Sequence, residues 1–300
     1  MAACGVMDVV WYLVASGLGR VNGEFRIDIN GLCRFSYPFA LGSFEGSHSS
    51  MEALRATLYA EARLRERIFI FRNIFLPPLR QQTDTDFNVS VLVGDQMPAA
   101  FLDQLRALTD GVKGVHLVVE PEGQDPKDLC TRIFRSMRRA DADLVGEFRL
   151  DDDDAVAVDF VARSRQCGLD FREPVVRHGV AGVDFPSGGF VYFLDRDVVV
   201  RRLVMAHLSC GQIIFLRPES SKSAIKYRHY RMWQKHLYIS LPEDVMYLRS
   251  VHGHNVSGVD RIVKTKDVIR MTDRQIDSMV RDRFGIDLSM VREDWAGFHA

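Results

Sequence analysis

Four consecutive aspartates, Asp151 to Asp154, are the residues whose type and spacing most clearly indicate chemistry. Carboxylates in a row repel one another unless a cation lies among them, and carboxylate oxygens are preferred ligands of Mg²⁺ and Mn²⁺. The run directly follows the apolar stretch 144–150, which is typical of a buried strand. Open α/β sheets bind ligands at the carboxyl ends of their strands. We therefore expect a metal or metal–nucleotide site, with Arg149 as the cation beside the run, although a solvated acidic surface remains the alternative.

Three known uses of such aspartates can be compared with the run. An EF-hand loop starting at Asp151 would need Gly and Glu where Val156 and Ala162 stand, so that motif is absent. Residues 152–156 fit the D-x-D-x-[TV] pattern of haloacid-dehalogenase-like phosphatases, but the run follows the fourth expected strand and no second acidic motif comes after it. The Asp-x-Asp site of nucleotide-sugar transferases, where carboxylates hold a divalent ion against the donor diphosphate, agrees better with this position.

The elements that must position the run alternate between strands and helices. Strands are expected at 31–38, 87–93, 115–119 and 144–150, and helices at 51–75, interrupted by Pro77-Pro78, and at 98–108, 125–139 and 155–167. Later apolar stretches at 175–176, 190–193 and 213–216 predict an antiparallel addition, followed by a terminal helix at 272–284. This order predicts an α/β fold with a mostly parallel, Rossmann-type sheet flanked by helices and a mixed or antiparallel C-terminal addition.

Composition excludes several classes of protein. With 39 Lys and Arg against 40 Asp and Glu, the net charge is −1, which gives no reason to coat nucleic acid. Five separated cysteines without a CxxC pair argue against zinc and disulfides and favour a cytoplasmic protein. The uncharged stretch 9–19 is too short to span a bilayer, so we expect no transmembrane segment, while peripheral membrane association stays open.

Three segments together resemble one family. Residues 79–95 (LRQQTDTDFNVSVLVGD), 33–37 (CRFSY) and 149–154 (RLDDDD) are similar to the bacterial rhamnosyltransferase family of GT-A fold, family 2-like glycosyltransferases, over about residues 31–284. The resemblance implies a GT-A-like fold, a nucleoside-diphosphate sugar as donor, a glycan or lipid-linked glycan as acceptor, and Mn²⁺ or Mg²⁺ as cofactor. It also implies a domain at 27–300, with a nucleotide-binding half at 27–155 and an acceptor-side half at 156–300. Residues 1–26 are then an extension or follow from a misassigned start.

The resemblance also implies a set of site residues. In the family pattern the end of the first strand lines the nucleoside pocket, and Asp151 and Asp153 form the Asp-x-Asp pair, with Asp153 nearer the metal. The register could instead use Asp152 and Asp154. The residues that would bind the donor are Arg34, Ser36, Tyr37, Asp95, Asp151 and Asp152, and those that would bind the metal are Asp153, Asp154 and His254, with His252 as the alternative histidine.

The acceptor side has its own candidates. Asp184, before the Gly188-Gly189 turn, is the expected general base that deprotonates an acceptor hydroxyl, and Glu219 is its rival. The basic, aromatic segment 222–236 could clamp a diphosphate or an anionic glycan, or could simply be a solvated helix face. Arg63, Arg65 and Arg67 are expected on an exposed helix face.

The sequence therefore predicts a metal-dependent glycosyltransferase acting in bacterial surface glycan assembly. A metal-dependent phosphohydrolase that uses the same aspartates is the competing enzyme. A non-catalytic protein that binds through an acidic loop is the third hypothesis.

Overall fold

A seven-stranded sheet, called sheet A, forms the centre of the molecule in a computed structural model that describes residues 25–43, 48–242, 244–253 and 268–298. Its strand order is β10-β6-β9-β4-β1-β2-β3. β9 runs antiparallel to both of its neighbours, and the other neighbouring pairs are parallel. The strands are β1 (Ile27–Arg34), β2 (Asn88–Gly94), β3 (Val115–Glu120), β4 (Leu144–Arg149), β6 (Val180–Asp184), β9 (Gln212–Leu216) and β10 (Leu237–Ser240).

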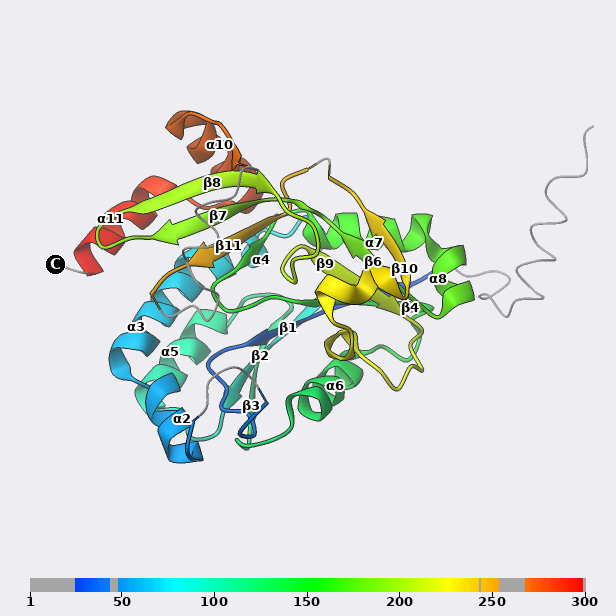
Figure 1. Cartoon of the computed structure of the whole chain (residues 1–300), viewed down its shortest axis with the longest axis horizontal. Helices are drawn as coiled ribbons and strands as arrows, with labels where there is room; N and C mark the ends of the chain where they lie inside the picture. The colour runs from blue at the N-terminus through cyan, green and yellow to red at the C-terminus, as the bar shows by residue number, and fades with distance from the viewer. Residues whose placement is uncertain (1–24, 44–47, 243, 254–267, 299–300) are drawn as a thin grey trace, which may run out of the picture.

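A second sheet, sheet B, has the order β12-β8-β7-β11-β5. Its strands are β5 (Ala155–Val156), β7 (Ser187–Phe193), β8 (Val198–Val204), β11 (Tyr247–Val251) and β12 (Val268–Ile269). In Figure 1, β7, β8 and β11 lie together at one end of the molecule, beside α10 (Asp273–Phe284) and α11 (Leu288–Phe298). The two-residue strand β5 directly follows the aspartates, so the acidic run connects the two sheets.

Helices cover both faces of sheet A because alternate side chains of its strands point to opposite faces. Ile27 and Ile29 of β1 belong to the same apolar cluster as residues of α7 (Phe160–Asp170). Leu32 belongs to the cluster on the other face, with residues of α6 (Pro126–Met137). The remaining helices that flank the sheet are α5 (Ala99–Thr109) and α8 (Arg172–His178).

The helical region that precedes β2 has an irregular path. It consists of α2 (Met51–Leu58), α3 (Glu61–Ile70), a π-helical turn (Phe71–Phe75) and α4 (Leu76–Arg80). Pro77 and Pro78 lack the N–H groups that a continuous helix would need. The π-helical turn precedes them, and they lie in the first turn of α4, where those N–H groups would have no partner within the helix. The predicted interruption at the prolines is therefore wrong, since the breaks lie at Tyr59–Ala60 and at the π turn.

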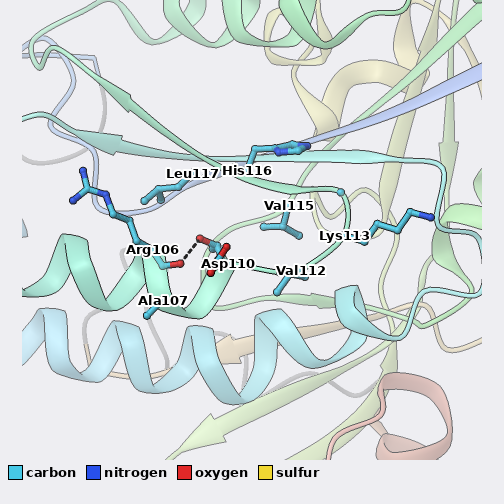
Figure 2. A pocket seen from close by; sticks show the side chains of 11 residues that line it. Arg106, Ala107, Asp110, Val112, Lys113, Val115, His116 and Leu117 are labelled. Carbon is cyan, nitrogen blue, oxygen red and sulfur yellow. Dashed lines mark hydrogen bonds between the residues drawn. The ribbon is translucent and has the colours of Figure 1, made fainter.

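A surface hollow of about 700 Å³ lies at the turn between α5 and β3 (Figure 2). It is lined by Arg106, Ala107, Thr109, Asp110, Gly111, Val112, Lys113, Gly114, Val115, His116 and Leu117. Val115 is the first residue of β3, so the hollow faces the amino edge of the parallel strands. Ligands of open α/β sheets bind at the opposite, carboxyl edge, where the acidic run follows β4, so the hollow lies away from that edge.

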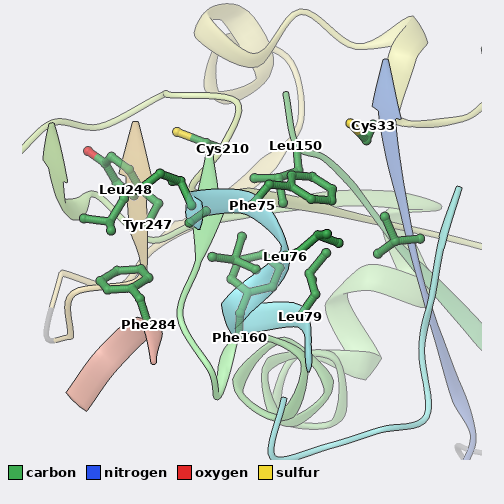
Figure 3. Close-up of a cluster of buried hydrophobic side chains, with 14 of the residues drawn as sticks. Cys33, Phe75, Leu76, Leu79, Leu150, Phe160, Cys210, Tyr247, Leu248 and Phe284 are labelled. Atoms are coloured by element: carbon green, nitrogen blue, oxygen red, sulfur yellow. The ribbon is translucent and has the colours of Figure 1, made fainter. Parts of the chain in front are cut away.

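The main hydrophobic core extends from sheet A to sheet B (Figure 3). Leu150, which lies between β4 and the aspartates, is buried in it together with Phe160 of α7 and Tyr247 of β11. Phe284 of α10 is also fully buried there. The residues on both sides of the acidic run are thus fixed by packing.

The predicted α/β class, with a mostly parallel sheet and a mixed C-terminal addition, is confirmed. Two predicted elements are wrong. Residues 155–156 form β5, and α7 begins only at Phe160, because Ala155 and Val156 pair with Leu248 and Tyr247 of β11. The apolar pair Val175-Val176 lies in α8 and not in a strand.

Three structural points bear on the remaining predictions. β1 begins at Ile27, while residues 1–24 lie outside the described part of the chain. The division into halves at residue 155 stays a prediction. Within the described ranges, none of the helices combines the length and the apolar character that crossing a membrane requires.

Candidate active site

The four aspartates lie at the carboxyl edge of sheet A, in the turn between β4 and β5. The amide of Asp154 donates to the carbonyl of Asp151 at 3.0 Å and closes this turn. Asp151 leaves 43% of its side chain exposed, whereas Asp152, Asp153 and Asp154 are buried. Only the first carboxylate of the run is therefore open to a ligand from solvent.

Arg67 of α3 neutralises the middle of the run. Its guanidinium forms a bidentate ion pair with Asp152, in which Nε lies 2.9 Å from Oδ2 and Nη2 contacts Oδ1. Its Nη1 donates to Asp153 Oδ2 at 3.1 Å. The expectation that Arg67 decorates an exposed helix face is wrong, because its side chain is buried against these carboxylates. Arg63 is half-buried, and Arg65 is exposed as expected.

A histidine connects Asp153 to a second carboxylate. His252, at the end of β11, places Nε2 2.9 Å from Asp153 Oδ2 and Nδ1 2.8 Å from Glu66 Oε1. Hydrogen bonds to these two carboxylates raise the pKa of His252 against the effect of burial, and the charge of Arg67 and the bonds to His252 hold the pKa of Asp153 well below its usual range despite burial. The histidine that the structure brings to the aspartates is His252, and His254 lies outside the described residues.

Asp154 differs from its neighbours. Its pKa is raised well above the usual range because it is buried and because the charges of Asp153 and Asp151 lie close to it. Its Oδ1 accepts a hydrogen bond from the Ser250 amide of β11 at 3.2 Å. Asp154 thus faces sheet B, and a protonated Asp154 would relieve part of the repulsion within the run.

Cations gather around the open carboxylate of Asp151. Arg34, at the end of β1, donates to Asp151 Oδ1 at 2.9 Å. Burial and the charge of Arg34 lower the pKa of Arg149 to about 10. The pKa of His229 is lowered to about 4 by burial and by the charges of Arg149 and Arg249. The expectation of Arg149 as the only cation beside the run is wrong, because the other cations come from segments distant in sequence.

The residues predicted to line a nucleoside pocket lie at the same edge of the sheet. Ser36 follows β1 with a positive φ of 50°, and its hydroxyl accepts from Arg63 Nη1 at 2.8 Å. The buried Tyr37 donates to the Pro121 carbonyl, and burial raises the pKa of this phenol to about 12. The exposed Asp95 accepts from the Glu122 amide at 3.2 Å. Tyr37 and Asp95 therefore border the same short loop after β3.

Asp184 lies at this edge too, at the carboxyl end of β6. Its side chain is fully buried, and its Oδ2 accepts from the His207 amide at 3.2 Å, whereas Oδ1 has no hydrogen-bond partner among the described residues. Burial raises the pKa of Asp184 to about 6. One strand, β9, lies between β6 and β4.

The other acceptor-side candidates are placed differently. Glu219 is exposed beyond the end of β9, which runs antiparallel to β4, so it lies at the opposite edge from Asp184. Gly188 and Gly189 lie inside β7, where an added Cβ would overlap Tyr247 and Leu248 of the neighbouring strand. These glycines therefore make room for the Tyr247 and Leu248 side chains within sheet B.

The donor set of the acidic run fits a divalent cation that also uses ligand oxygens. Among residues 25–43, 48–242, 244–253 and 268–298, no three His, Cys, Asp or Glu side chains form a complete metal cage. Mg²⁺ sites commonly use one or two carboxylates with substrate phosphates and water. His252 Nε2 lies 3.0 Å from Arg67 Nη1 and also contacts the Asp153 carboxylate. Glu66 contacts the other ring nitrogen, Nδ1, and many metal-bound histidines have a carboxylate in this position. Asp151 is the open carboxylate of this kind, whereas Asp153 and His252 are buried and bonded to each other and to Arg67, and could contact an ion only after exchanging these bonds.

Several of these residues were not identified as site residues from the sequence. Glu66, Arg67, His207 and Arg249 come from different segments, and no local motif marks them. The sequence holds a weak signal for Arg67, because this arginine lies on the apolar face of its helix and is buried together with that face.

Comparison with protein families gives one match. Residues 28–264 match a family model described as "Putative rhamnosyl transferase". A search of curated proteins finds no match.

Solved structures give weak similarities. A mannosyltransferase from Pyrobaculum calidifontis in complex with GDP-Man and Mn²⁺ is 11% identical, with a TM-score of 0.42, over 98% of this chain and 80% of that chain. TarS residues 1–349 of S. aureus in complex with UDP-GlcNAc is 10% identical, with a TM-score of 0.39, over 85% of this chain and 71% of that chain. For another TarS 1–349 structure the TM-score is 0.35 at 11% identity, and the match covers 74% of this chain but only 60% of TarS 1–349. Similarities this low carry no argument about activity or ligands.

Proposed function

The chain belongs to the family described as putative rhamnosyl transferases, a family of glycosyltransferases, and from this premise we propose that it transfers a sugar from a nucleoside-diphosphate donor to a glycan acceptor. The observation that carries the proposal is the half-exposed Asp151 at the carboxyl edge of a mostly parallel sheet, with Arg34, Arg149 and Arg249 around it. Arginine is well suited to bind a diphosphate because its planar donors match phosphate oxygens. Rhamnose is the sugar that the family description suggests.

The donor would bind across the ends of β1, β2 and β4. Arg34, Ser36, Tyr37 and Asp95 are then the residues on the nucleoside side, with the diphosphate directed at Asp151 and its arginines. The buried Asp152 would not touch the donor, since Arg67 occupies both of its oxygens, and its role would be to hold the turn.

A divalent cation would first contact the exposed Asp151, and Asp153 and His252 would join it as ligands by giving up their hydrogen bond to each other. When bound, Mn²⁺ or Mg²⁺ would offset the negative charge that develops on the departing nucleoside diphosphate. Glu66 would orient the imidazole, and Arg67 would keep Asp152 from competing for the ion. Asp154, turned toward sheet B, would not be a ligand.

Asp184 is the proposed general base. Its raised pKa, about 6, suits a carboxylate that must accept a proton near neutral pH, and its Oδ1 is not occupied by another described residue. In an inverting reaction this carboxylate takes the acceptor hydroxyl proton while the oxygen bonds to the sugar's anomeric carbon and the bond to the diphosphate breaks. The side chain is buried before the acceptor binds, so a shift of the His207 loop must accompany binding.

Thermal shift with UDP, dTDP and GDP, each with and without Mn²⁺, tests the proposal. We expect stabilisation by one nucleoside diphosphate in the presence of the metal. Asp151→Asn should abolish this shift without loss of stability, because Asp151 is the exposed member of the run; Asp103→Asn on the exposed face of α5 is the matched control. Indifference to all three nucleotides would refute the transferase, and release of phosphate from simple esters would support the phosphohydrolase instead.

A further inference from the structure

An unbalanced cationic segment lies beside the proposed active site. Residues 220–242 contain five Lys or Arg and no Asp or Glu, although the whole chain has a net charge of −1. Of the five, Lys226 pairs with Asp128 at 3.0 Å. The other four, Lys222, Arg228, Arg231 and Lys235, are exposed and make no ion pair with another described residue. A surface that concentrates positive charge in this way attracts anionic ligands.

Two exposed aromatic rings share this segment. Tyr230 and Trp233, in the 3₁₀ helix His229–Gln234, have exposed fractions of 48% and 53%, unusually large for such side chains. The Arg231 guanidinium lies 5.5 Å from the centre of the Tyr230 ring. Exposed aromatic faces beside cations are suited to pack against the apolar face of a ring in a ligand while the cations contact its charged groups.

Contacts of the segment connect it to the proposed base. The Trp233 ring stacks on His207 with a centroid distance of 6.0 Å, and the His207 amide donates to Asp184. His207 Nδ1 also lies 3.1 Å from the hydroxyl of Tyr238 on β10. His229 lies at the start of the same 3₁₀ helix, and the charges of Arg149 and Arg249, which lie beside Asp151, help to lower its pKa. The segment therefore borders both the donor side and the base.

We propose that residues 222–235, called here the cationic platform, bind the acceptor, and that this acceptor is an anionic glycan that carries carboxylate or phosphate groups. This inference rests on the proposed glycosyltransferase function and adds the chemical class of the acceptor. A glycan ring on Trp233 would lie beside His207, the residue that covers Asp184, while Lys222, Arg228, Arg231 and Lys235 contact acidic groups along the chain. A neutral glycan would leave these four cations without a role.

The test measures binding of polygalacturonate, an anionic glycan, and dextran, a neutral one, to the full chain. We expect polygalacturonate to bind and dextran to bind at least tenfold more weakly, and raised salt should remove the difference. Binding of polygalacturonate should weaken roughly tenfold in the triple variant Lys222→Ala/Arg228→Ala/Arg231→Ala, because three exposed charge contacts are lost together. The matched control is Lys113→Ala/Arg196→Ala/Arg274→Ala, which removes three exposed cations elsewhere.

Trp233→Ala separates stacking from charge. It should weaken polygalacturonate roughly fivefold without changing the salt dependence, because it removes no charge. Equal binding of dextran and polygalacturonate, or equal loss in the two triple variants, would overturn the proposal. Tighter binding of a single-stranded oligonucleotide, or of anionic phospholipid vesicles, would overturn it in favour of those ligands.

The donor assay keeps the two proposals apart. If a nucleoside diphosphate and Mn²⁺ stabilise the chain while polygalacturonate does not bind, the acceptor class is wrong and the transferase stands. If no nucleotide binds, the proposed function itself fails.

Discussion

Replacing Arg67 by alanine tests whether this arginine is the cation that allows four aspartates to lie together. The substitution leaves Asp152, of which 1% of the side chain is exposed, without this ion-pair partner, and it removes the Arg67 contact of Asp153. Removing one member of a buried ion pair costs about 3–5 kcal/mol because the remaining charge is left unpaired in the interior. We expect a loss within this range in the free energy of unfolding at pH 7.

Arg65 provides the control on the same helix. It pairs with Glu61 four residues earlier, and both side chains are more than half exposed. Such a pair contributes about 0.3–0.5 kcal/mol, so Arg65→Ala should cost no more than that. Arg67→Lys, which keeps the charge and loses the bidentate geometry, should fall between the two.

Urea unfolding followed by tryptophan fluorescence measures the difference, provided that the slope of the transition is the same in all variants. The pH dependence is a second check. In the wild type, the pKa of Asp153 is lower in the folded state than in the unfolded state, so this residue adds stability that is lost as pH falls. In Arg67→Ala, buried aspartates that lack the arginine bind protons more readily in the folded state than in the unfolded state. The variant therefore gains stability as pH falls. The difference between the two proteins should therefore shrink toward pH 4. A cost for Arg67→Ala no larger than that for Arg65→Ala would refute the reasoning.

Three further predictions follow from other parts of the site and core. The pKa of Asp184 is raised to about 6 in the folded state, above the value near 4 in the unfolded chain, so the stability of the protein falls as pH rises from about 4 to about 6. In urea titrations, Asp184→Asn should therefore stabilise the protein by about 3 kcal/mol at pH 8 and by little at pH 4. Transfer activity should be lost in this variant. Gly188→Ala should lower the free energy of unfolding by about 1–3 kcal/mol, because its Cβ would overlap the Tyr247 ring, whereas Gly297→Ala, with open space around it, should not be destabilising. Glu66→Ala should weaken Mn²⁺-dependent nucleotide binding about 10–100-fold in the thermal-shift assay, since the His252 ring loses its orienting carboxylate, and unchanged affinity would exclude His252 as a metal ligand.

The sequence predicts the first four strands of the fold because their signals are local. Apolar stretches with β-branched residues between amphipathic helices indicated β1 to β4, and the position of the aspartates after β4 followed from them. The same local pattern failed at Ala155 and Val156, where pairing with β11, more than ninety residues away, decides the strand. Short strands of this kind take their structure from partners that no window of sequence contains.

The site illustrates the same limit. The acidic run was identified as a site because four like charges in a row are visible without any fold. Its partner Arg67 was hidden, since an arginine on a helix is an ordinary residue until folding brings it to the carboxylates, and His252 was foreseen only as the alternative to His254. Only when these partners are known can the three buried carboxylates of the run be distinguished from the exposed one.

The acidic turn has a consequence for how the protein could be divided or recombined. Its first carboxylate is open to solvent, while the next three are held by α3, by the end of β11 and by the Ser250 amide. An excised fragment that ends at residue 155 would carry every aspartate and lack His252, Ser250 and the strand that anchors the turn. A chimera that kept residues 27–155 and replaced the rest would retain Arg34 and Arg67 beside the turn, but it would lose the contacts of Asp153 with His252 and of Asp154 with the Ser250 amide, so the two halves are poor modules for exchange.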